Sequence, residues 1–233
     1  MKKLGILGGM GPLATALFYE MIVKRTKAEC DQDHFNTLIY SNASIPKRVE
    51  YLLGQSEENP LNEMIASAKL LEDASCDLIA MPCVTAHAFY KEVSESVRIP
   101  FLNMITETIN YLKKENIKRV GIMASDGTIS AGHLQKNLEE NGIEVLLPDS
   151  KNQARIRRAI YDEIKKNKKV FRLNLVKVQK HLIRKGAQLN LIACTDLSVY
   201  NFEHPLGPKN LDMMEVLVSK IINVMSQFRE CSG

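Results

Sequence analysis

Two cysteines stand at matching places in the two halves of the chain, and they are the residues best suited to chemistry. Cys83 follows an apolar run in Asp77-Leu-Ile-Ala-Met-Pro-Cys83, and Cys194 follows a similar run in Asn190-Leu-Ile-Ala-Cys194. Such runs suit buried strands of a parallel sheet, so each cysteine is expected at the carboxyl end of a strand. Ligands of open α/β sheets bind just outside those ends, which predicts both thiols at a ligand site.

Two opposed thiols predict proton transfer at carbon. A thiolate can remove a proton from one face of a stereocentre while a thiol delivers a proton to the other face. The alternative is that Cys83 and Cys194 are small buried hydrophobic residues, the commonest role of an intracellular cysteine. Their matched positions favour function, because Cys83 lies 78 positions after Gly5 and Cys194 lies 73 after Gly121, and the segments around these glycines are similar.

A glycine-rich segment, Gly8-Gly-Met-Gly11, lies between an expected strand and an expected helix. Backbone N–H groups and a helix N-terminus in such a turn can surround a carboxylate or a phosphate. A plain tight turn is an equal alternative. A cofactor-binding turn is the least favoured, because the segment is neither G-x-G-x-x-G nor a Walker loop.

The elements that must position these residues alternate between strand and helix. We expect strands at 4–7, 37–40, 78–81, 98–103, 120–123, 144–147 and 189–193, and a turn at 124–128. Helices are expected at 13–27, 60–74, 106–114, 130–140, 152–167, 171–185 and 211–228. This rhythm predicts an α/β protein. We expect two pseudo-symmetric domains, each a mostly parallel sheet flanked by helices, with the active site in the cleft between them. The first would comprise residues 1–104 with the returning helix in 211–233, and the second residues 105–210.

Composition and charge exclude several classes of protein. The 233 residues are 45% hydrophobic and 25% charged, as in a soluble globular protein. No apolar run approaches the roughly 20 residues of a membrane span, and the first residues do not resemble a signal peptide, so we expect a cytoplasmic protein without a membrane partner. The net charge of +4 does not predict nucleic-acid binding. A basic cluster at 155–169 is either a solvated helix face or a source of cations for an anionic substrate.

The cysteine pattern indicates neither a disulfide framework nor a structural metal. The chain has five cysteines, with no C-x-x-C and no His/Cys cluster at zinc-ligand spacing. Cys30, Cys76 and Cys231 have no counterpart in the other half, and we assign them no role.

Three motifs, in this order, resemble the aspartate/glutamate racemase family. They are Gly8-Gly-Met-Gly-Pro-Leu-Ala-Thr15, Met81-Pro-Cys-Val-Thr-Ala-His87 and Cys194-Thr-Asp-Leu197. The resemblance extends over almost the whole chain. It implies two pseudo-symmetric α/β domains and an amino-acid racemase that uses no cofactor and no metal. The implied partner is a small acidic amino acid, aspartate or glutamate. The oligomeric state stays open, with a homodimer among the options.

The resemblance also implies site residues. Cys83 and Cys194 would be the two acid/base groups, Arg48 would hold the side-chain carboxylate of the substrate in a bidentate pair, and Lys165 would be a second cation for it. The remaining implied substrate-binding residues are two in the first loop, two near the α-carboxylate and two directly after the cysteines: Met10, Gly11, Thr85, Thr128, Val84 and Thr195.

The chain departs from the family pattern at three places: at Val84, at Lys47 and in Ala193-Cys-Thr-Asp196, where the family usually has Gly-Cys-Thr-Glu. Val84 stands where the family usually has an asparagine, so a side-chain amide that could bind the substrate is missing. Lys47 stands where the family usually has an aspartate, which changes the local charge by two units. The preferred amino acid is therefore left open.

Two polar neighbours of the cysteines have alternative interpretations. His87 either orients the helix after Cys83 or polarises a thiol, or it is a capping or satisfied interior histidine. Asp196 either hydrogen-bonds near Cys194 or caps a helix.

Other functions remain in competition with racemisation. A related decarboxylase or a maleate-isomerase-type enzyme would keep the scaffold and use the cysteines differently. A two-lobed protein that binds a small ligand without chemistry is the alternative of a different class.

Overall fold

The first half of the chain forms a parallel sheet of four strands, and its apolar runs become the central strands. The computed structural model describes residues 2–230. The strands β1 (Lys3–Gly8), β2 (Asn36–Ser41), β3 (Leu78–Ala80) and β4 (Phe101–Leu102) lie in the order β2-β1-β3-β4. Leu4 pairs with Leu78, so the two apolar runs of this half are neighbours in the sheet.

The second half repeats this arrangement. The strands β5 (Arg119–Met123), β6 (Glu144–Leu146), β7 (Leu189–Ile192) and β8 (Asn210–Asp212) form a second parallel sheet in the order β6-β5-β7-β8. In both sheets the first strand of the half lies between the second and the third. The predicted α/β fold, with two parallel sheets flanked by helices, is confirmed. Cys83 and Cys194 follow β3 and β7, the equivalent strands of the two sheets.

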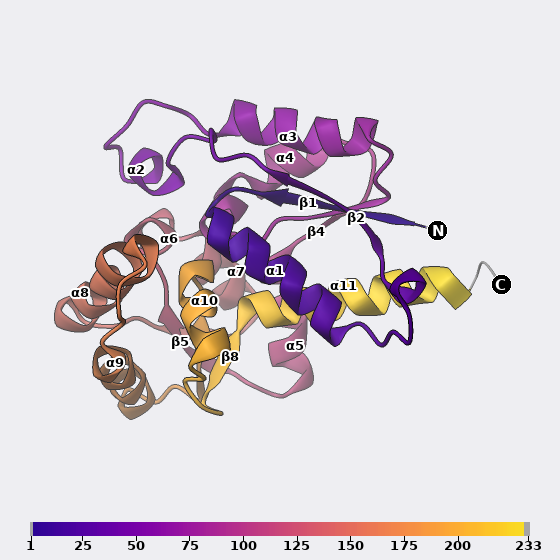
Figure 1. Ribbon diagram of the computed structural model, residues 1–233. Coiled ribbons are helices and arrows are strands. Elements are labelled where there is room, and N and C mark those ends of the chain that lie inside the picture. The colour runs from indigo at the N-terminus through magenta and orange to yellow at the C-terminus, as the bar shows by residue number, and fades with distance from the viewer. Residues whose placement is uncertain (1, 231–233) are drawn as a thin grey trace.

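Helices connect the strands and cover the sheets (Figure 1). The α-helices are α1 (Pro12–Arg25), α2 (Arg48–Leu52), α3 (Leu61–Asp73), α4 (Tyr90–Glu95), α5 (Met104–Lys114), α6 (Asp126–Ala131), α7 (His133–Glu140), α8 (Ser150–Arg158), α9 (Arg172–Arg184), α10 (Thr195–Glu203) and α11 (Met213–Glu230). Shorter helical turns are η1 (Asp31–Asp33), η2 (Thr85–Phe89), η3 (Ala159–Glu163) and η4 (Ile164–Lys166).

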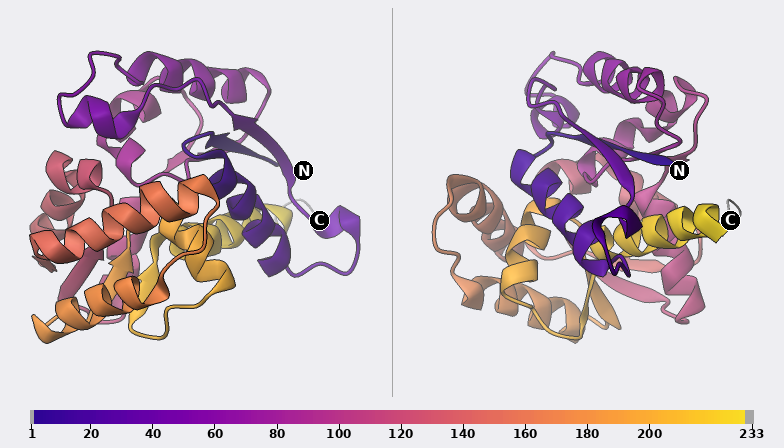
Figure 2. Two further views of the ribbon diagram at one scale, coloured as in Figure 1. Left: turned by 60° about the vertical axis from the view of Figure 1, so that its left-hand side comes forward. Right: turned by 45° about the vertical axis from the view of Figure 1, so that its right-hand side comes forward.

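The molecule is layered, and its largest core lies between the two sheets. This core joins one face of each sheet to α1, α5, α7 and α11. A second cluster packs α3 and α4 on the outer face of the first sheet, and a third packs α8 and α9 on the outer face of the second. The last helix, α11, packs beside α1, as both views in Figure 2 show. The proposed domain boundaries at 104/105 and 210/211 stay a prediction.

Three predicted elements in the second half differ from the structure. The predicted helix 130–140 is two helices, because Gly132 adopts a left-handed conformation (φ 68°) between α6 and α7. The predicted turn 124–128 is helical from Asp126 onward, since Ser125 caps α6 and accepts a hydrogen bond from the N–H of Thr128. The predicted helix 152–167 starts earlier, at Ser150, and after Arg158 continues only as η3 and η4.

The strand β8 was not predicted, and the helix expected from residue 211 begins at Met213. Leu211 and Asp212 instead extend the sheet, pairing with Leu191 and Ile192 of β7. The side chain of Asp212 then ends the strand, because it accepts a hydrogen bond from the N–H of Met214 (2.9 Å) at the start of α11.

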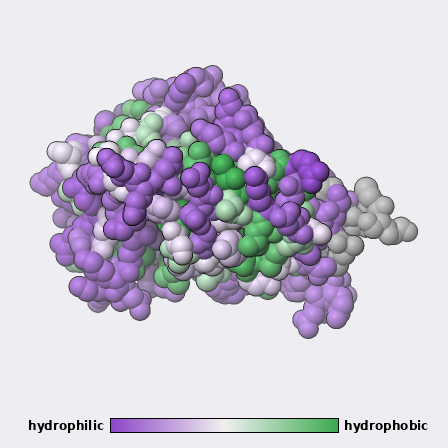
Figure 3. All heavy atoms as spheres, turned by 90° about the horizontal axis from the view of Figure 1, so that it is seen from above, coloured by the Kyte–Doolittle hydropathy of each residue, from purple (hydrophilic) through white to green (hydrophobic). Residues whose placement is uncertain are grey.

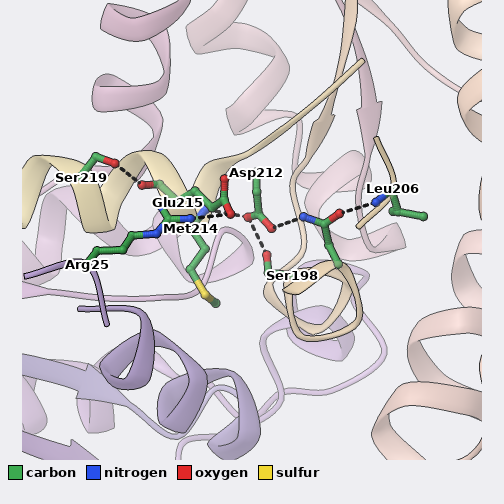
Figure 4. A network of polar contacts seen from close by, with 8 residues as sticks. Arg25, Ser198, Leu206, Asp212, Met214, Glu215 and Ser219 are labelled. Carbon is green, nitrogen blue, oxygen red and sulfur yellow. Dashed lines mark hydrogen bonds and ion pairs between the residues drawn. The ribbon is translucent and has the colours of Figure 1, made fainter. Parts of the chain in front are cut away.

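Asp212 also joins α11 to α10 (Figure 4). It accepts hydrogen bonds from Ser198 Oγ (2.7 Å) and Asn201 Nδ2 (3.4 Å), both on α10. The carboxyl is buried, and this burial raises its pKa to about 7 against the hydrogen bonds that lower it. The helix that follows Cys194 is thereby held at the junction of the second sheet with the last helix.

The surface is mostly hydrophilic on the face shown in Figure 3, where a hydrophobic stretch crosses the middle. Within residues 2–230, no helix combines the length and hydrophobicity that crossing a bilayer requires. Cys231 lies outside the described residues.

Candidate active site

A cleft of about 300 Å³ is lined by residues of both halves of the chain, among them the two cysteines at matching positions, Cys83 and Cys194. Its lining includes Cys83, Val84 and Thr85 from the first half and Cys194, Thr195 and Asp196 from the second. The other lining residues are Met10, Lys47, Arg48, Val49, Glu50, Ser125, Ile160, Tyr161 and Lys165.

The backbone at Cys83 is fixed by His87. The Nδ1 of His87 lies 2.8 Å from the carbonyl oxygen of Cys83, and its Nε2 lies 3.0 Å from the backbone nitrogen of Met104. Since the N–H of Met104 can only donate, Nε2 is the acceptor and Nδ1 carries the proton. Burial lowers the pKa of His87 to about 4, which agrees with a neutral ring. Both ring nitrogens are occupied by backbone groups, so His87 is a satisfied interior histidine and does not polarise the thiol.

A second histidine, His133 from the second half of the chain, contacts the backbone of Val84, the residue after Cys83. His133, the first residue of α7, places Nε2 at 3.1 Å from the carbonyl oxygen of Val84. Burial lowers the pKa of His133 as well, so its neutral ring donates from Nε2. The spacing of His133 in the sequence carries no signal for this contact with residue 84.

Cys194 occupies the N-cap position of α10 without a capping hydrogen bond from its side chain, and it is buried. Burial raises the pKa of its thiol, and the adjacent carboxylate of Asp196 raises it further, whereas the N–H groups of Asp196 and Leu197 lower it. The Sγ donates to Asp196 Oδ2 at 3.8 Å. Cys194 is therefore a protonated thiol in the free protein at neutral pH.

Asp196 links Cys194 to Lys165. The Nζ of Lys165, on η4, lies 2.9 Å from the same Oδ2 of Asp196. Burial lowers the pKa of Lys165, but the attraction of Asp196, with smaller contributions from Cys194 and Cys83, raises it above its ordinary value. Asp196 lies inside α10 rather than at its cap, so the hydrogen-bonding interpretation of this residue is correct.

Arg48 lies at the start of α2 with part of its guanidinium unsatisfied. Its Nη1 donates to the carbonyl oxygens of Ile45 (3.1 Å) and Pro46 (2.9 Å), while its buried Nε has no partner among the described residues. Of the three Lys and Arg side chains that line the cleft within residues 2–230, Lys47 pairs with Glu50 and Lys165 with Asp196, whereas Arg48 has no carboxylate partner.

Hydroxyl groups from both halves meet beside the cysteines. Thr85 Oγ1 lies 2.7 Å from Thr128 Oγ1 and 3.2 Å from Ser125 Oγ. Thr85 and Ser125 line the cleft, but Thr128 is fully buried and lies behind Thr85, outside the lining. Thr128 is therefore a support for Thr85 in this structure rather than a surface of the cleft.

The glycine-rich segment forms a tight turn at the edge of the cleft. The N–H of Gly9 donates to Thr15 Oγ1 (2.9 Å), so this donor serves the turn itself. Met10 lines the cleft. Gly11 is not among the lining residues, but it lies next to them, because a β-carbon on Gly11 would be 3.7 Å from Asp196 Oδ1 and 3.8 Å from Lys165 Nζ.

Several lining residues were not predicted. Tyr161 lies one turn before Lys165, and burial together with nearby negative charges raises its pKa. Glu50 lies three residues after Lys47, a spacing at which opposite charges pair on a helix, and this signal was available in the sequence. Val49, Ser125 and Ile160 carried no comparable signal. In the described part of the chain, no group of three or more His, Cys, Asp or Glu side chains is placed to hold a metal ion.

Comparisons with known proteins identify the family. A family model described as Asp/Glu/hydantoin racemase matches residues 7–221. The broad specificity amino-acid racemase RacX of Bacillus subtilis is 31% identical over 199 residues, which cover 84% of this chain and 86% of that protein.

Solved structures agree. The aspartate racemase of Picrophilus torridus has a TM-score of 0.84 and 32% identity, covering 96% of this chain and 94% of its own. An aspartate racemase homologue from Pyrococcus horikoshii shares the fold, with a TM-score of 0.79 at 24% identity over 97% of this chain and 100% of its own. The chain therefore belongs to the Asp/Glu/hydantoin racemase family and is an amino-acid racemase, an isomerase of a type that works without a cofactor.

Proposed function

We propose that the protein racemises an acidic amino acid by proton transfer between Cys83, Cys194 and the α-carbon. The observation that carries this proposal is the presence of both thiols in one cleft, each at the carboxyl end of the equivalent strand of its sheet. Lys165 is close enough to be influenced by both cysteines, which supports a small shared site.

The reaction would run in two balanced proton transfers. One cysteine, as thiolate, takes the α-proton and becomes a thiol, and the electron pair of the broken C–H bond stays on the substrate. The other cysteine, as thiol, then gives its proton to the opposite face and becomes a thiolate. Since Cys194 is a thiol in the free protein, it supplies the donated proton in one direction, and Cys83 supplies it in the other.

The acidic substrate class is supported by Arg48. A guanidinium binds a carboxylate in a bidentate manner, and among residues 2–230 the cleft-lining Arg48 has an unsatisfied Nε and no acidic partner. A side-chain carboxylate of aspartate or glutamate would supply that partner. The prediction from the sequence that Arg48 recognises this group thus gains a physical reason.

The test of the chemistry is α-proton exchange in deuterated water with single-enantiomer aspartate and glutamate. Cys83→Ala and Cys194→Ala should each abolish racemisation, because each removes the proton carrier for one face. Cys76→Ala is the matched control, since Cys76 is a buried cysteine of the first half, like Cys83, but lies outside the cleft. Racemisation at the wild-type rate in either cleft variant would refute the mechanism.

The test of the substrate class is Arg48→Lys. Lysine keeps the charge but lacks the planar guanidinium that pairs with both carboxylate oxygens. The transition-state stabilisation of aspartate and glutamate should therefore fall by about 1.5–3 kcal/mol. The same substitution should leave alanine turnover unchanged. Equal effects on alanine and aspartate would separate Arg48 from side-chain recognition.

A second candidate is racemisation of a broader range of amino acids. It is favoured by Val84, which lines the cleft with an apolar side chain, and by the similarity to a relative named for broad specificity. Comparable kcat/KM for neutral and acidic amino acids would select this alternative. A preference for acidic substrates of about tenfold or more would exclude it.

A further inference from the structure

An amino-acid substrate brings an α-ammonium group into the cleft, and this group needs an acceptor. A buried ammonium without a partner is costly, and a carboxylate is its strongest partner. Within residues 2–230, the carboxylates that line the cleft are those of Glu50 and Asp196. The choice between them follows from the contacts that each already makes.

Asp196 is engaged in the free protein. One of its oxygens, Oδ2, lies 2.9 Å from Lys165 Nζ and accepts the thiol of Cys194 at 3.8 Å. Its side chain is only 15% exposed. If Asp196 paired with the substrate ammonium instead, the partly buried charge of Lys165 would lose this partner.

Glu50 is bound only weakly. Within the described part of the chain its one ion pair is with Lys47 at 3.3 Å, and the side chain of Lys47 is 80% exposed. Ion pairs of this kind contribute little, because the lysine is almost as well solvated without its partner. A substrate ammonium can therefore replace Lys47 at Glu50 with little loss.

The position of Glu50 is set by contact between the two halves. Its neighbour Val49 packs on Gly127 of α6 so closely that a β-carbon on residue 127 would lie 2.8 Å from the Cα of Val49. This contact holds the first turn of α2 against the second half, with Arg48, Val49 and Glu50 all lining the cleft. A cation for the side-chain carboxylate and an anion for the α-ammonium are thus carried by the same turn.

We propose that Glu50 binds the α-ammonium group of the substrate. The assignment rests on the proposed function, because it takes the ligand to be an amino acid. Glu50 acts as a binding residue and takes no part in proton transfer. Three residues before Glu50, Lys47 stands where the family usually has an aspartate. Glu50 therefore supplies a negative charge to a part of the cleft that lacks this aspartate.

The experiment compares aspartate with succinate, which has the same two carboxylates but no ammonium, by calorimetric titration. Glu50→Gln should weaken aspartate binding by about 10- to 100-fold, the range for a hydrogen bond to a charged group. Succinate should bind equally well or more tightly, since a negative charge has been removed. Glu50→Asp should recover part of the aspartate affinity. Glu92→Gln, an exposed glutamate in the first turn of α4, is the matched control.

Two outcomes would overturn the proposal: unchanged aspartate binding in Glu50→Gln, or an equal loss for aspartate and succinate. If the wild-type protein prefers neutral ligands, alanine and propionate form the same matched pair. Wild-type protein that binds aspartate through Glu50 but exchanges no α-proton would refute the proposed function and leave this inference standing.

Discussion

The Nδ1 of His87 donates to the carbonyl oxygen of Cys83, four residues before it, at 2.8 Å. The same ring accepts from the N–H of Met104 at the start of α5. One neutral imidazole therefore ties the turn that carries a cleft cysteine to the helix that follows the first sheet. His87 thus acts on the backbone of Cys83 rather than on its sulfur.

Replacement of His87 by alanine should destabilise the fold. The carbonyl of Cys83 and the N–H of Met104 would lose their partner in a buried site, and each unsatisfied group costs about 1–3 kcal/mol. The free energy of unfolding, from urea titration, should fall by at least the lower end of that range. His181→Ala is the control, because His181 is a half-buried histidine remote from the cleft. An equal loss in both variants would contradict the assignment.

The same histidine predicts a pH dependence of stability. Its folded pKa is about 4, below the ordinary value of 6.5, so between these pH values the unfolded chain binds more protons than the native protein. The contribution of His87 to stability is complete above pH 6.5 and is lost as the pH falls toward 4. His87→Gln should remove this contribution, so the gap in unfolding free energy between wild type and variant should narrow on acidification. A gap independent of pH would argue against the buried neutral ring.

For Asp212 the expected pH dependence of stability has the opposite sign. Its folded pKa of about 7 lies above the ordinary 3.8, so between these values the native protein binds more protons than the unfolded chain. Stability from this group is present at low pH and is lost as the pH rises toward 7. Asp212→Asn keeps an acceptor for Ser198 and Met214, loses the longer hydrogen bond from Asn201 (3.4 Å), and abolishes the titration. The variant should therefore gain stability relative to wild type from pH 4 to pH 8 in urea titrations, whereas exposed Asp73→Asn should show no such gain.

The fold was predictable because each half repeats one pattern. Apolar runs that end at a cysteine, such as Leu78–Met81, can be satisfied only as central parallel strands, and the structure confirms them with one residue of difference at the end. The strand β8 was not predictable by the same logic. Its three residues, Asn210–Asp212, become a strand only by pairing with β7, a contact distant in sequence.

The residues that line the cleft were predictable only where the family resemblance implied them. Arg48 and Lys165 follow from the family resemblance, and both line the cleft. Thr128, which the resemblance implies near the α-carboxylate, lies outside the cleft lining and contacts Thr85, because its depth depends on how α6 packs, and its role in substrate binding stays a prediction. The contact of His133 with Val84 crosses between the halves, and no local pattern in one chain segment encodes such an approach.

Gly127 tests whether α2 must lie close to α6. A β-carbon at this residue would approach Val49 to 2.8–2.9 Å, so Gly127→Ala should push the short helix away. The free energy of unfolding should fall by about 1–3 kcal/mol. The KM for aspartate should rise more than kcat falls, since Arg48 and Glu50 move with α2. Ser130→Ala, an exposed change on the same helix, should alter neither the free energy of unfolding nor the two kinetic constants. A lower kcat at constant KM would place the effect on the cysteines instead.

Asp196 sets the protonation of Cys194. Burial and the carboxylate of Asp196 both raise the pKa of this thiol, and Asp196→Asn removes the second cause. The same substitution frees Lys165 from its 2.9 Å ion pair, and a free cation beside the sulfur also favours the thiolate. Both effects lower the pKa, so alkylation of Cys194 by iodoacetamide at pH 7.5 should become faster, by about tenfold for each unit of decrease. Peptide mapping by mass spectrometry separates Cys194 from the other cysteines, and Asp162→Asn, which removes an exposed carboxylate paired with Lys166, is the matched control. If Asp196→Asn left the alkylation rate of Cys194 unchanged or slowed it, Asp196 would not control this thiol, and the resting proton on Cys194 would have to be ascribed to burial alone.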